Sequence, residues 1–585
     1  MGSTAVNRLQ QALGALVERI DTPAPIVPAH VMRNDIDRIQ GFAAEHSLDV
    51  RPHVKTHKCV EIGRRQVKAE TNGITAGNVV RPRSSPRPDS TASSSSVAVT
   101  PPSSTGPRGS QRQITDTPMN TLAARPRNGE LGFWVAQLAD KRPSFPRFTG
   151  QDSVDVAIVG GGYTGLWAAY FAKKLEPSLS VAVFEAEQVG YGASGRNGGW
   201  LSAMPPGNRA TFARAGGGLE ASRALQQEFV AGVDAVLDIL QAEGIDADQH
   251  KGGALVAAHT RAGLGRLVTR RDADLKYGLT EDEIQLLDRD EFQSRINIST
   301  VHGGLFYKHC ARIHPAKLVY GLADTVTSMG VRIYEGSRVR SAGGRTLTLA
   351  DGRVTAARTF ICTEGYSGQL LGSRTLIPVN SSMIVTKPLP KEAWQRIGWD
   401  GPQCLSDSAH TFIYAQRTAD GRIAMGGRGV PYRFGSGTGG AGATARSTID
   451  LISHKLSSFF PGIPFEVDHA WSGVLGVTRD WNGGVHWDPA SGVGSSTGYA
   501  GHGVTSAYVG GRTLVELAFE QETERTTLPW VGYRSRKWEP EPFRWLGVHA
   551  MYRLFGIADQ WEERRGSSTT SLLARFGSRL AGLHE

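Results

Sequence analysis

The sequence predicts an α/β (α+β) fold that combines a parallel sheet flanked by helices with a separate antiparallel sheet. Three observations predict it. The apolar run Val154–Val159 leads through a glycine turn into an apolar helix, as in a βα unit. Short strand patterns bounded by turn residues recur between residues 251 and 479. The 71 glycines indicate many tight turns, or backbone that lies close to a ligand.

Composition excludes several functional classes. A length of 585 residues requires more than one domain. The formal charge of +10 comes from scattered basic residues without a nucleic-acid-binding motif, so we expect no nucleic-acid partner. No apolar run is long enough to span a membrane, and the first residues lack a signal pattern, so we expect a cytoplasmic protein. The four cysteines are far apart and form no CxxC pair, so we expect neither a metal site nor a dithiol centre.

A dinucleotide-binding fingerprint follows the first strand. Its glycines, Gly160, Gly162 and Gly165, have the spacing GxGxxG. We expect Gly160 to allow the tight turn, Gly162 to let the backbone approach a pyrophosphate, and Gly165 to let helix and strand pack closely. Tyr163 and Thr164 open the helix, whose free N–H groups and positive dipole end favour phosphate.

An acidic residue completes the fingerprint. Glu185 directly follows the next strand, Val181–Phe184, and lies twenty residues beyond Gly165. A carboxylate at this place accepts hydrogen bonds from the adenosine ribose. The GxGxxG spacing alone is weak, but between a strand and a helix, with this acid, it predicts a Rossmann-like site.

A second glycine-rich stretch, Gly190–Trp200, has five glycines in eleven residues, which lets backbone lie against a flat ligand. Here the chain resembles the D-amino acid oxidase family of FAD enzymes, and the string GASGRNGG is most similar to its gamma-glutamylputrescine oxidoreductase branch. The resemblance implies FAD contacts from Ala193, Ser194, Arg196, Asn197, Gly198 and Gly199.

Later segments resemble the same family in the same order. Ala311–Pro315 is similar to the segment before the helix that returns to the FAD domain. Arg358–Tyr366 is similar to the strand that ends under the cofactor, which implies contacts from Thr363 and Gly365. Val339 stands where the family places a backbone contact to adenine.

The turn Gly498–Gly503 precedes a helix predicted over Val504–Phe519. The resemblance places this turn beside the flavin pyrimidine ring and implies contacts from Gly501, His502, Gly503 and Val504. A helix N-terminus there would stabilise the negative charge of reduced flavin. His502 has two interpretations, a group beside the flavin or a turn residue that only bonds backbone.

The substrate side is predicted from an antiparallel sheet with strands at Ala254–Ala258, Ser382–Lys387, Thr411–Arg417, Arg422–Gly426 and His469–Val477, and with a hairpin turn at Asp420-Gly421. Glycine-oxidase-like members of the family carry a carboxylate-binding Arg in the pattern Trp-x-Gly-x-Arg. Here the pattern ends at Leu475. Arg479, Arg417 or Arg428 could replace that Arg, and Tyr414 is either a pocket residue or part of the core.

The N-terminal segment Arg51–Lys58, RPHVKTHK, resembles the lysine motif of D-threonine aldolase and D-serine dehydratase, in which Lys55 matches the PLP lysine. A PLP-binding (β/α)8 barrel needs about 250 residues. Only a partial β/α fragment precedes residues 80–113, which hold ten Ser, six Pro and no aromatic residue and are predicted to be disordered. We therefore expect no PLP at Lys55.

Four regions result: a partial PLP-barrel-like fragment (1–79), a disordered linker (80–118), an FAD-dependent oxidoreductase (119–529) and a helical tail (530–585). Within the enzyme, the FAD domain is expected at about 153–250, 310–370 and 480–529, and the substrate domain at about 251–309 and 371–479. No cysteine lies in Asp480–Gly503, where sarcosine-oxidase-type enzymes attach FAD, so we expect the FAD to be non-covalent.

The resemblance implies oxidation of the C–N bond of an amine or amino acid. A hydride passes to flavin N5, the imine product hydrolyses, and oxygen or another acceptor takes the electrons. Two alternatives remain: a D-amino acid or glycine oxidase or dehydrogenase acting on an α-carboxylate substrate, and a flavin-binding protein without turnover. The missing second nucleotide fingerprint argues against reduction by NAD(P)H.

Overall fold

The structure is a computed structural model that describes residues 126–439, 441–567, 569–571, 574–575 and 577–578, without the side chains of residues 428–431. These described residues all belong to one compact unit. The predictions for residues 1–118, including Lys55 and the linker, lie outside the described residues.

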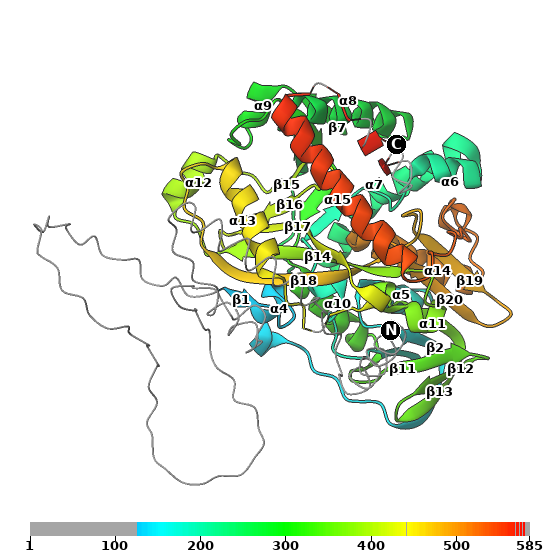
Figure 1. The fold of residues 1–585 in the computed structure, drawn as a ribbon. Coiled ribbons are helices and arrows are strands. Elements are labelled where there is room, and N and C mark those ends of the chain that lie inside the picture. The colour runs from blue at the N-terminus through cyan, green and yellow to red at the C-terminus, as the bar shows by residue number, and fades with distance from the viewer. Residues whose placement is uncertain (1–125, 440, 568, 572–573, 576, 579–585) are drawn as a thin grey trace, which may run out of the picture. The chain divides into compact units, whose positions relative to one another are not determined.

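An eight-stranded sheet contains the dinucleotide fingerprint (Figure 1). Its strands are β10 (Arg332–Tyr334), β3 (Val181–Phe184), β2 (Gly150–Val159), β13 (Gly352–Ile361), β12 (Thr346–Leu349) and β11 (Val339–Gly343), with β20 (Val493–Thr497) on β13 and β19 (Gly484–Asp488) on β20. The neighbours β10, β3, β2, β13 and β20 are parallel, so their carboxyl ends meet at one edge.

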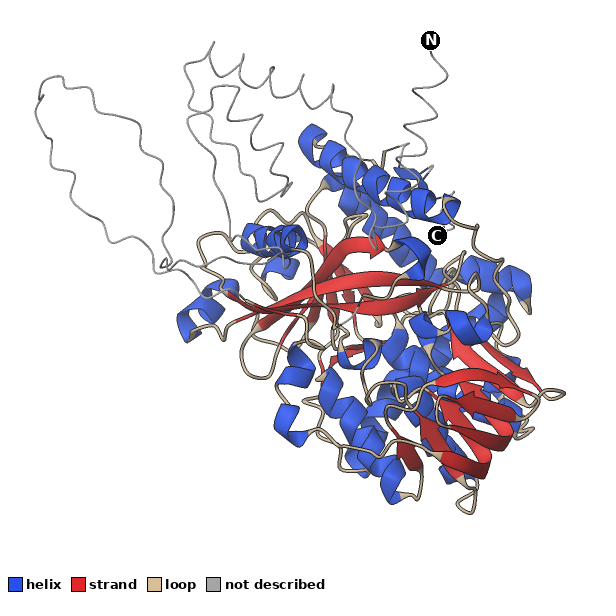
Figure 2. Cartoon of the chain, turned by 60° about the horizontal axis from the view of Figure 1, so that its bottom comes forward, coloured by secondary structure: helices blue, strands red, loops and turns tan. Residues whose placement is uncertain are grey.

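A nine-stranded sheet forms the second layer, and Figure 2 shows the two sheets as separate red layers with helices around them. Its order is β1 (Arg127–Asn128), β18 (Val467–Val477), β14 (Ile377–Thr386), β17 (Ile423–Tyr432), β16 (Tyr414–Arg417), β15 (Cys404–Asp407), β6 (Ala254–Ala257), β8 (Gly304–Tyr307) and β7 (Ile284–Leu287). The predicted hairpin at Asp420-Gly421 joins β16 to β17, which are antiparallel. A small sheet holds β4 (Trp200–Ser202), β9 (Cys310–Arg312) and β5 (His250–Lys251).

Helices complete the layers. They are α4 (Phe133–Ala136), α5 (Tyr163–Leu175), α6 (Arg209–Ala215), α7 (Gly218–Ala242), α8 (Arg261–Lys276), α9 (Arg289–Gln293), α10 (Pro315–Ser328), α11 (Gly368–Leu371), α12 (Lys391–Ile397), α13 (Arg446–Phe459), α14 (Gly503–Ala518) and α15 (Phe543–Arg565). Short 3-10 turns include η2 (Ala193–Gly195) and η3 (Glu364–Tyr366). Of the helices between residues 126 and 578, none combines the length and hydrophobicity that a membrane crossing requires.

Two cores explain the layering. The apolar faces of α5, α7, α10 and α14 pack on one side of the parallel sheet and reach one face of the nine-stranded sheet. The other face of the nine-stranded sheet is covered by α12 and α13 through residues such as Trp394, Ile449 and Ile452. The predicted α/β fold with a parallel and an antiparallel sheet is therefore confirmed.

Candidate functional site

The site lies at the carboxyl edge of the parallel sheet. Strand β2 has β3 on one side and β13 on the other. The chain therefore runs from β2 to one side of the sheet through β3 and later returns to the other side through β13, so the strand order switches between β2 and β13. Ligands of such sheets bind at this crevice, outside the carboxyl ends of the strands. Helices α5 and α14 begin there, because they follow β2 and β20.

The glycine turn after β2 requires glycine for steric reasons. Gly160 has φ of +108°, and a Cβ there would lie 2.6 Å from the carbonyl oxygen of Cys362. A Cβ on Gly165 would lie 2.1 Å from the Gly160 oxygen. Gly162 caps α5 with no side-chain hydrogen bond, and its Cβ would meet Ser194 Oγ at 2.9 Å. The tight turn and the close helix–strand approach expected from the spacing are both present.

The first residues of α5 join the fingerprint to the other loops of the edge. The backbone N–H of Tyr163 donates to Ser194 Oγ at 2.9 Å, and its phenol donates to the Pro315 oxygen at 3.0 Å. Thr164 Oγ1 lies 3.1 Å from the hydroxyl of Tyr499, in the turn before α14. These hydrogen bonds connect the start of α5 to three other segments at this edge of the sheet, those of Ser194, Pro315 and Tyr499.

Glu185 lies at the end of β3, as predicted. Its carboxylate accepts the N–H of Gly161 at 2.7 Å and the N–H of Glu187 at 2.9 Å. Burial raises the pKa of Glu185, and the two backbone hydrogen bonds oppose that shift. The carboxylate is thus fixed against the glycine turn, where a ribose hydroxyl would bind.

The loop Ala193–Gly199 is held by Asn197. Its Nδ2 donates to the Ser194 oxygen at 2.9 Å, and its Oδ1 accepts the N–H of Gly199 at 2.8 Å. A Cβ on Gly198 would lie 2.7 Å from the ring of Tyr414, and one on Gly199 would lie 1.9 Å from Gln416 Nε2. The loop is therefore pressed against the nine-stranded sheet.

Arg196 shows that the edge fits an anionic cofactor. Its side chain is 2% exposed, and its Nε and Nη2 atoms have no hydrogen-bond partner. Its Nη1 donates only a long bond of 3.4 Å to the Ser472 oxygen, and its guanidinium lies 4.6 Å from the Tyr191 ring centroid. A buried cation without a counter-charge is costly, so the arrangement suits a ligand such as FAD, whose pyrophosphate is anionic.

The loop after β13 carries a buried acid, Glu364, for which no role was predicted. Thr363 and Gly365 flank Glu364, which has a positive φ of 43°. The Glu364 carboxylate accepts the N–H groups of Gly498 at 2.9 Å and Tyr499 at 3.0 Å. Burial raises the pKa of Glu364 to about 7, against the effect of these bonds. The feature of the sequence that could have identified Glu364 is an acidic residue shortly after a predicted strand that ends at this edge of the sheet.

Val339 begins β11 and is 5% exposed, in the small core on the face of the parallel sheet away from α5. It lies in the same sheet as the fingerprint strand but two strands away from β13 in the sheet order. Its predicted backbone contact to adenine stays a prediction.

The turn before α14 presents an uncapped helix N-terminus. Helix α14 begins at Gly503, followed by Val504, and its cap residue His502 makes no side-chain cap bond. Gly501 has φ of +112°. The His502 ring is accessible to solvent, yet the surrounding protein desolvates it and lowers its pKa to about 4, so it is neutral near pH 7.

Tyr414 lies between the two layers. Its hydroxyl is 2.7 Å from Ser381 Oγ on β14, and a Cβ on Gly426 would overlap its ring. Burial raises the pKa of Tyr414 to about 12, so the phenol stays neutral. The ring reaches the loop at Gly198, which places Tyr414 against the predicted cofactor loop.

Two of the three candidate arginines are already engaged. Arg479 donates from Nε to both carboxylate oxygens of Glu539 at 3.0 Å. Arg417 donates to the Trp399 oxygen at 2.6 Å. The side chain of Arg428 is not described, but its backbone pairs with Ser381 in the sheet. Arg479 is thus bound to the C-terminal segment and is the weaker candidate for a substrate clamp.

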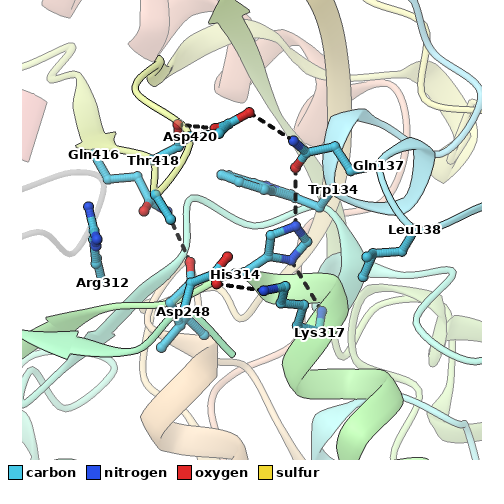
Figure 3. Close-up of a pocket in the computed structure, with 12 residues that line it drawn as sticks. Trp134, Gln137, Leu138, Asp248, Arg312, His314, Lys317, Gln416, Thr418 and Asp420 are labelled. Atoms are coloured by element: carbon cyan, nitrogen blue, oxygen red, sulfur yellow. Dashed lines mark hydrogen bonds and ion pairs between the residues drawn. The ribbon is translucent and has the colours of Figure 1, made fainter. Parts of the chain in front are cut away.

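A cavity of about 370 Å³ lies next to the loop 197–199, and Figure 3 shows the residues that line it. Trp134 and Gln416 line it, and they donate hydrogen bonds to the oxygens of Asn197 at 2.9 Å and Gly198 at 2.8 Å. Neither Tyr414 nor His502 lines it. The cavity therefore does not include the two residues predicted to act on the substrate side, Tyr414 and His502.

Comparisons with known proteins agree with this geometry. Residues 155–517 match the family described as FAD dependent oxidoreductase. The probable oxidoreductase OrdL of Rhizobium meliloti is 30% identical over 403 residues, covering 67% of this chain and 89% of that protein. The gamma-glutamylputrescine oxidoreductase of Escherichia coli is 28% identical over 394 residues, covering 66% and 88%. The glycine oxidase structure from Geobacillus kaustophilus has the same fold, with a TM-score of 0.53 and 20% identity over 63% of this chain and 96% of that one.

A short second similarity bears on the predicted PLP-barrel resemblance. The D-threonine aldolase of an Arthrobacter species is 33% identical over 66 residues, which cover 11% of this chain and 17% of that enzyme. The resemblance to this enzyme class is confirmed as a short segment. The family match covers residues 155–517, which include the dinucleotide fingerprint. The chain therefore belongs to the family of FAD-dependent oxidoreductases.

Proposed function

We propose that the chain oxidises the C–N bond of an amine or amino acid, and that the imine product hydrolyses in water. Two relatives support this substrate class by their names, the gamma-glutamylputrescine oxidoreductase of Escherichia coli and the sarcosine oxidase subunit beta of Rhizobium meliloti, the latter 22% identical over 390 residues. When bound, FAD accepts a hydride from the substrate carbon. Oxygen or another acceptor takes the electrons afterwards.

The FAD is proposed to be non-covalent. No cysteine lies in Asp480–Gly503, and the three cysteines among the described residues are buried free thiols. Arg196, Glu185 and the N-terminus of α5 would hold its phosphates and ribose. The uncapped N-terminus of α14 would stabilise negative charge on the reduced ring.

The substrate would bind on the face of β14, β16 and β18 that meets the loop 193–199. Tyr414 and Ser381 form a neutral hydrogen-bonded pair on this face, which can orient an amine by accepting its N–H. His502 lies in the turn before α14, and its lowered pKa keeps it neutral near pH 7. None of the side chains of Tyr414, Ser381 and His502 contributes a positive charge that could bind a substrate carboxylate.

Leu475 is the observation that carries our preference for amines lacking an α-carboxylate. It lies on β18, partly buried, and a Cβ on Gly501 would be 3.9 Å from its Cδ1. A carboxylate next to a leucine would lose its hydration without gaining a charged partner. Of the three arginines predicted as replacements, Arg479 and Arg417 have engaged side chains, and the side chain of Arg428 is not described.

The test is anaerobic bleaching of the bound flavin by putrescine-type amines, sarcosine, glycine and D-alanine. We expect the amines without an α-carboxylate to reduce the flavin faster. Leu475→Arg should shift the preference toward glycine and sarcosine, whereas Leu475→Met should not. Faster reduction of the wild type by α-amino acids would contradict the preference, and Arg428→Ala would then test the remaining arginine. Absence of bleaching by any amine would favour a flavin-binding protein without turnover.

A further inference from the structure

The C-terminal helix α15 packs on the domain through polar groups. The carboxylate of Asp559 accepts the backbone N–H groups of His410 at 2.8 Å and Thr411 at 3.0 Å. Glu562 is 1% exposed and accepts from Arg266 Nη1 of α8 at 2.6 Å. Asp559 is thus held by hydrogen bonds and Glu562 by an ion pair with the domain beneath.

Closer to the N-terminus of α15, further contacts to the domain are also polar. Arg544 donates to the Ser373 oxygen at 3.0 Å, and His549 Nε2 donates to the Tyr432 oxygen of β17 at 2.9 Å. Phe555 is the large apolar side chain of α15 that is buried, at 4% exposure. The attachment of α15 therefore combines hydrogen bonds and ion pairs with apolar packing by Trp545, Val548 and Phe555.

The outer face of α15 is apolar instead. Phe543 is 66% exposed, Leu546 53%, Ile557 58% and Trp561 41%. With Ala550 they recur at intervals of three, four and seven residues, which places them on one side of an α-helix. Over the 23 residues of α15 the stripe extends for about 34 Å. Figure 1 shows the helix, in red, across the front of the molecule.

The stripe is also basic. Arg553 and Arg564 have the same helical spacing as the apolar residues and are exposed, and Arg565 lies 4.6 Å over the Trp561 ring. No carboxylate of α15 has this spacing, since Asp559 and Glu562 face the domain and Glu563 is on another side of the helix. An exposed face of aromatic, aliphatic and arginine side chains matches a membrane interface.

We propose that this stripe, formed by Phe543, Leu546, Ala550, Arg553, Ile557, Trp561 and Arg564, docks the enzyme on the surface of an anionic phospholipid bilayer. The apolar side chains enter the boundary between headgroups and acyl chains, and the arginines bind lipid phosphates. The helix lies in the interface and does not span it, in agreement with its attachment to the domain.

The charge of the stripe favours a bilayer over a second copy of the chain. An antiparallel pairing of two stripes would bring Arg553, near the middle of the helix, close to its own counterpart, without a carboxylate on either stripe to offset the repulsion. An anionic lipid surface supplies the missing negative charge along the whole stripe.

The experiment measures co-sedimentation of the full-length, FAD-loaded protein with vesicles of phosphatidylcholine, with or without phosphatidylserine. We expect binding to the phosphatidylserine vesicles that weakens at high salt. Ile557→Glu combined with Trp561→Glu should weaken it by at least about tenfold, and Arg553→Gln with Arg564→Gln should weaken it mainly at low salt. Leu175→Glu is the matched control, because Leu175 is 41% exposed, as Trp561 is, but lies on α5.

Flavin absorbance and far-UV circular dichroism of each variant establish that it is folded, and these spectra should match the wild type. Sedimentation equilibrium without vesicles measures the oligomeric state. Absence of wild-type vesicle binding overturns the proposal, as does equal binding by Ile557→Glu/Trp561→Glu. A dimer that these variants dissociate would assign the stripe to a second copy instead. Every one of these results is independent of the substrate assigned above.

Discussion

Replacing Glu364 by Gln is expected to stabilise the protein increasingly, relative to the wild type, as the pH rises. The native pKa of Glu364, about 7, exceeds its ordinary value of 4.5 because burial disfavours the charged form. Folding therefore favours the protonated acid. This favourable contribution is fully present below pH 4.5 and is lost as the pH rises through about 7.

The size of the effect follows from the shift. A displacement from 4.5 to about 7 corresponds to roughly 3 kcal/mol between the two protonation states, at about 1.4 kcal/mol per pKa unit. The amide of Gln carries no charge at any pH, and its single oxygen can accept one of the two backbone N–H groups that Glu364 binds. The free energy of unfolding of Glu364→Gln, measured relative to the wild type, should therefore rise by up to roughly 3 kcal/mol between pH 4.5 and pH 8.

The assay is urea unfolding of both proteins at several pH values, with Glu392→Gln as the control, since Glu392 is exposed on α12. The control should show no comparable gain. A difference between Glu364→Gln and the wild type that does not change with pH, or that shifts against the variant as the pH rises, would refute the reasoning. The carboxylate would then be held by interactions that outweigh its burial.

Three further predictions concern the cofactor and the first residues. Gly165→Ala should abolish FAD binding or folding, because its Cβ would lie 2.1 Å from a backbone oxygen, whereas Gly216→Ala has open space and should be neutral; released FAD measures both. Glu185→Ala should weaken FAD binding by about 1–3 kcal/mol in calorimetry, and Glu187→Ala should change it little. A chain starting at Met119 should bind FAD with the same stoichiometry as the full chain, and loss of FAD or solubility would show that residues 1–118 are needed.

Local patterns were sufficient to predict much of the fold. The strand and turn around Gly160 follow from an apolar run and glycine spacing, and β2 only starts four residues earlier than the predicted Val154. The helix predicted over Val504–Phe519 is α14, displaced by one residue. The strand predicted over Thr411–Arg417 is shorter, Tyr414–Arg417, because Asp559 of α15 holds the N–H of Thr411.

Long-range pairings could not be predicted in this way. Glu364 meets Gly498 across 134 residues, and Arg479 meets Glu539 across 60 residues. Sequence spacing says nothing about which charged side chain another segment will reach after folding, so Glu364 had no assigned role and Arg479 was placed at the substrate. The roles of the glycine residues and of backbone groups in the turns were easier to predict, because they depend on steric contacts between residues close in the sequence.

The parallel sheet also determines when the enzyme can mature during synthesis. Its central strand β2 ends at Val159, but β20 and α14, which complete the same edge, end at Thr497 and Ala518. Helix α14 packs directly against α5, some 340 residues earlier in the chain. The ribosome must therefore release almost the whole catalytic region before the cofactor crevice is closed.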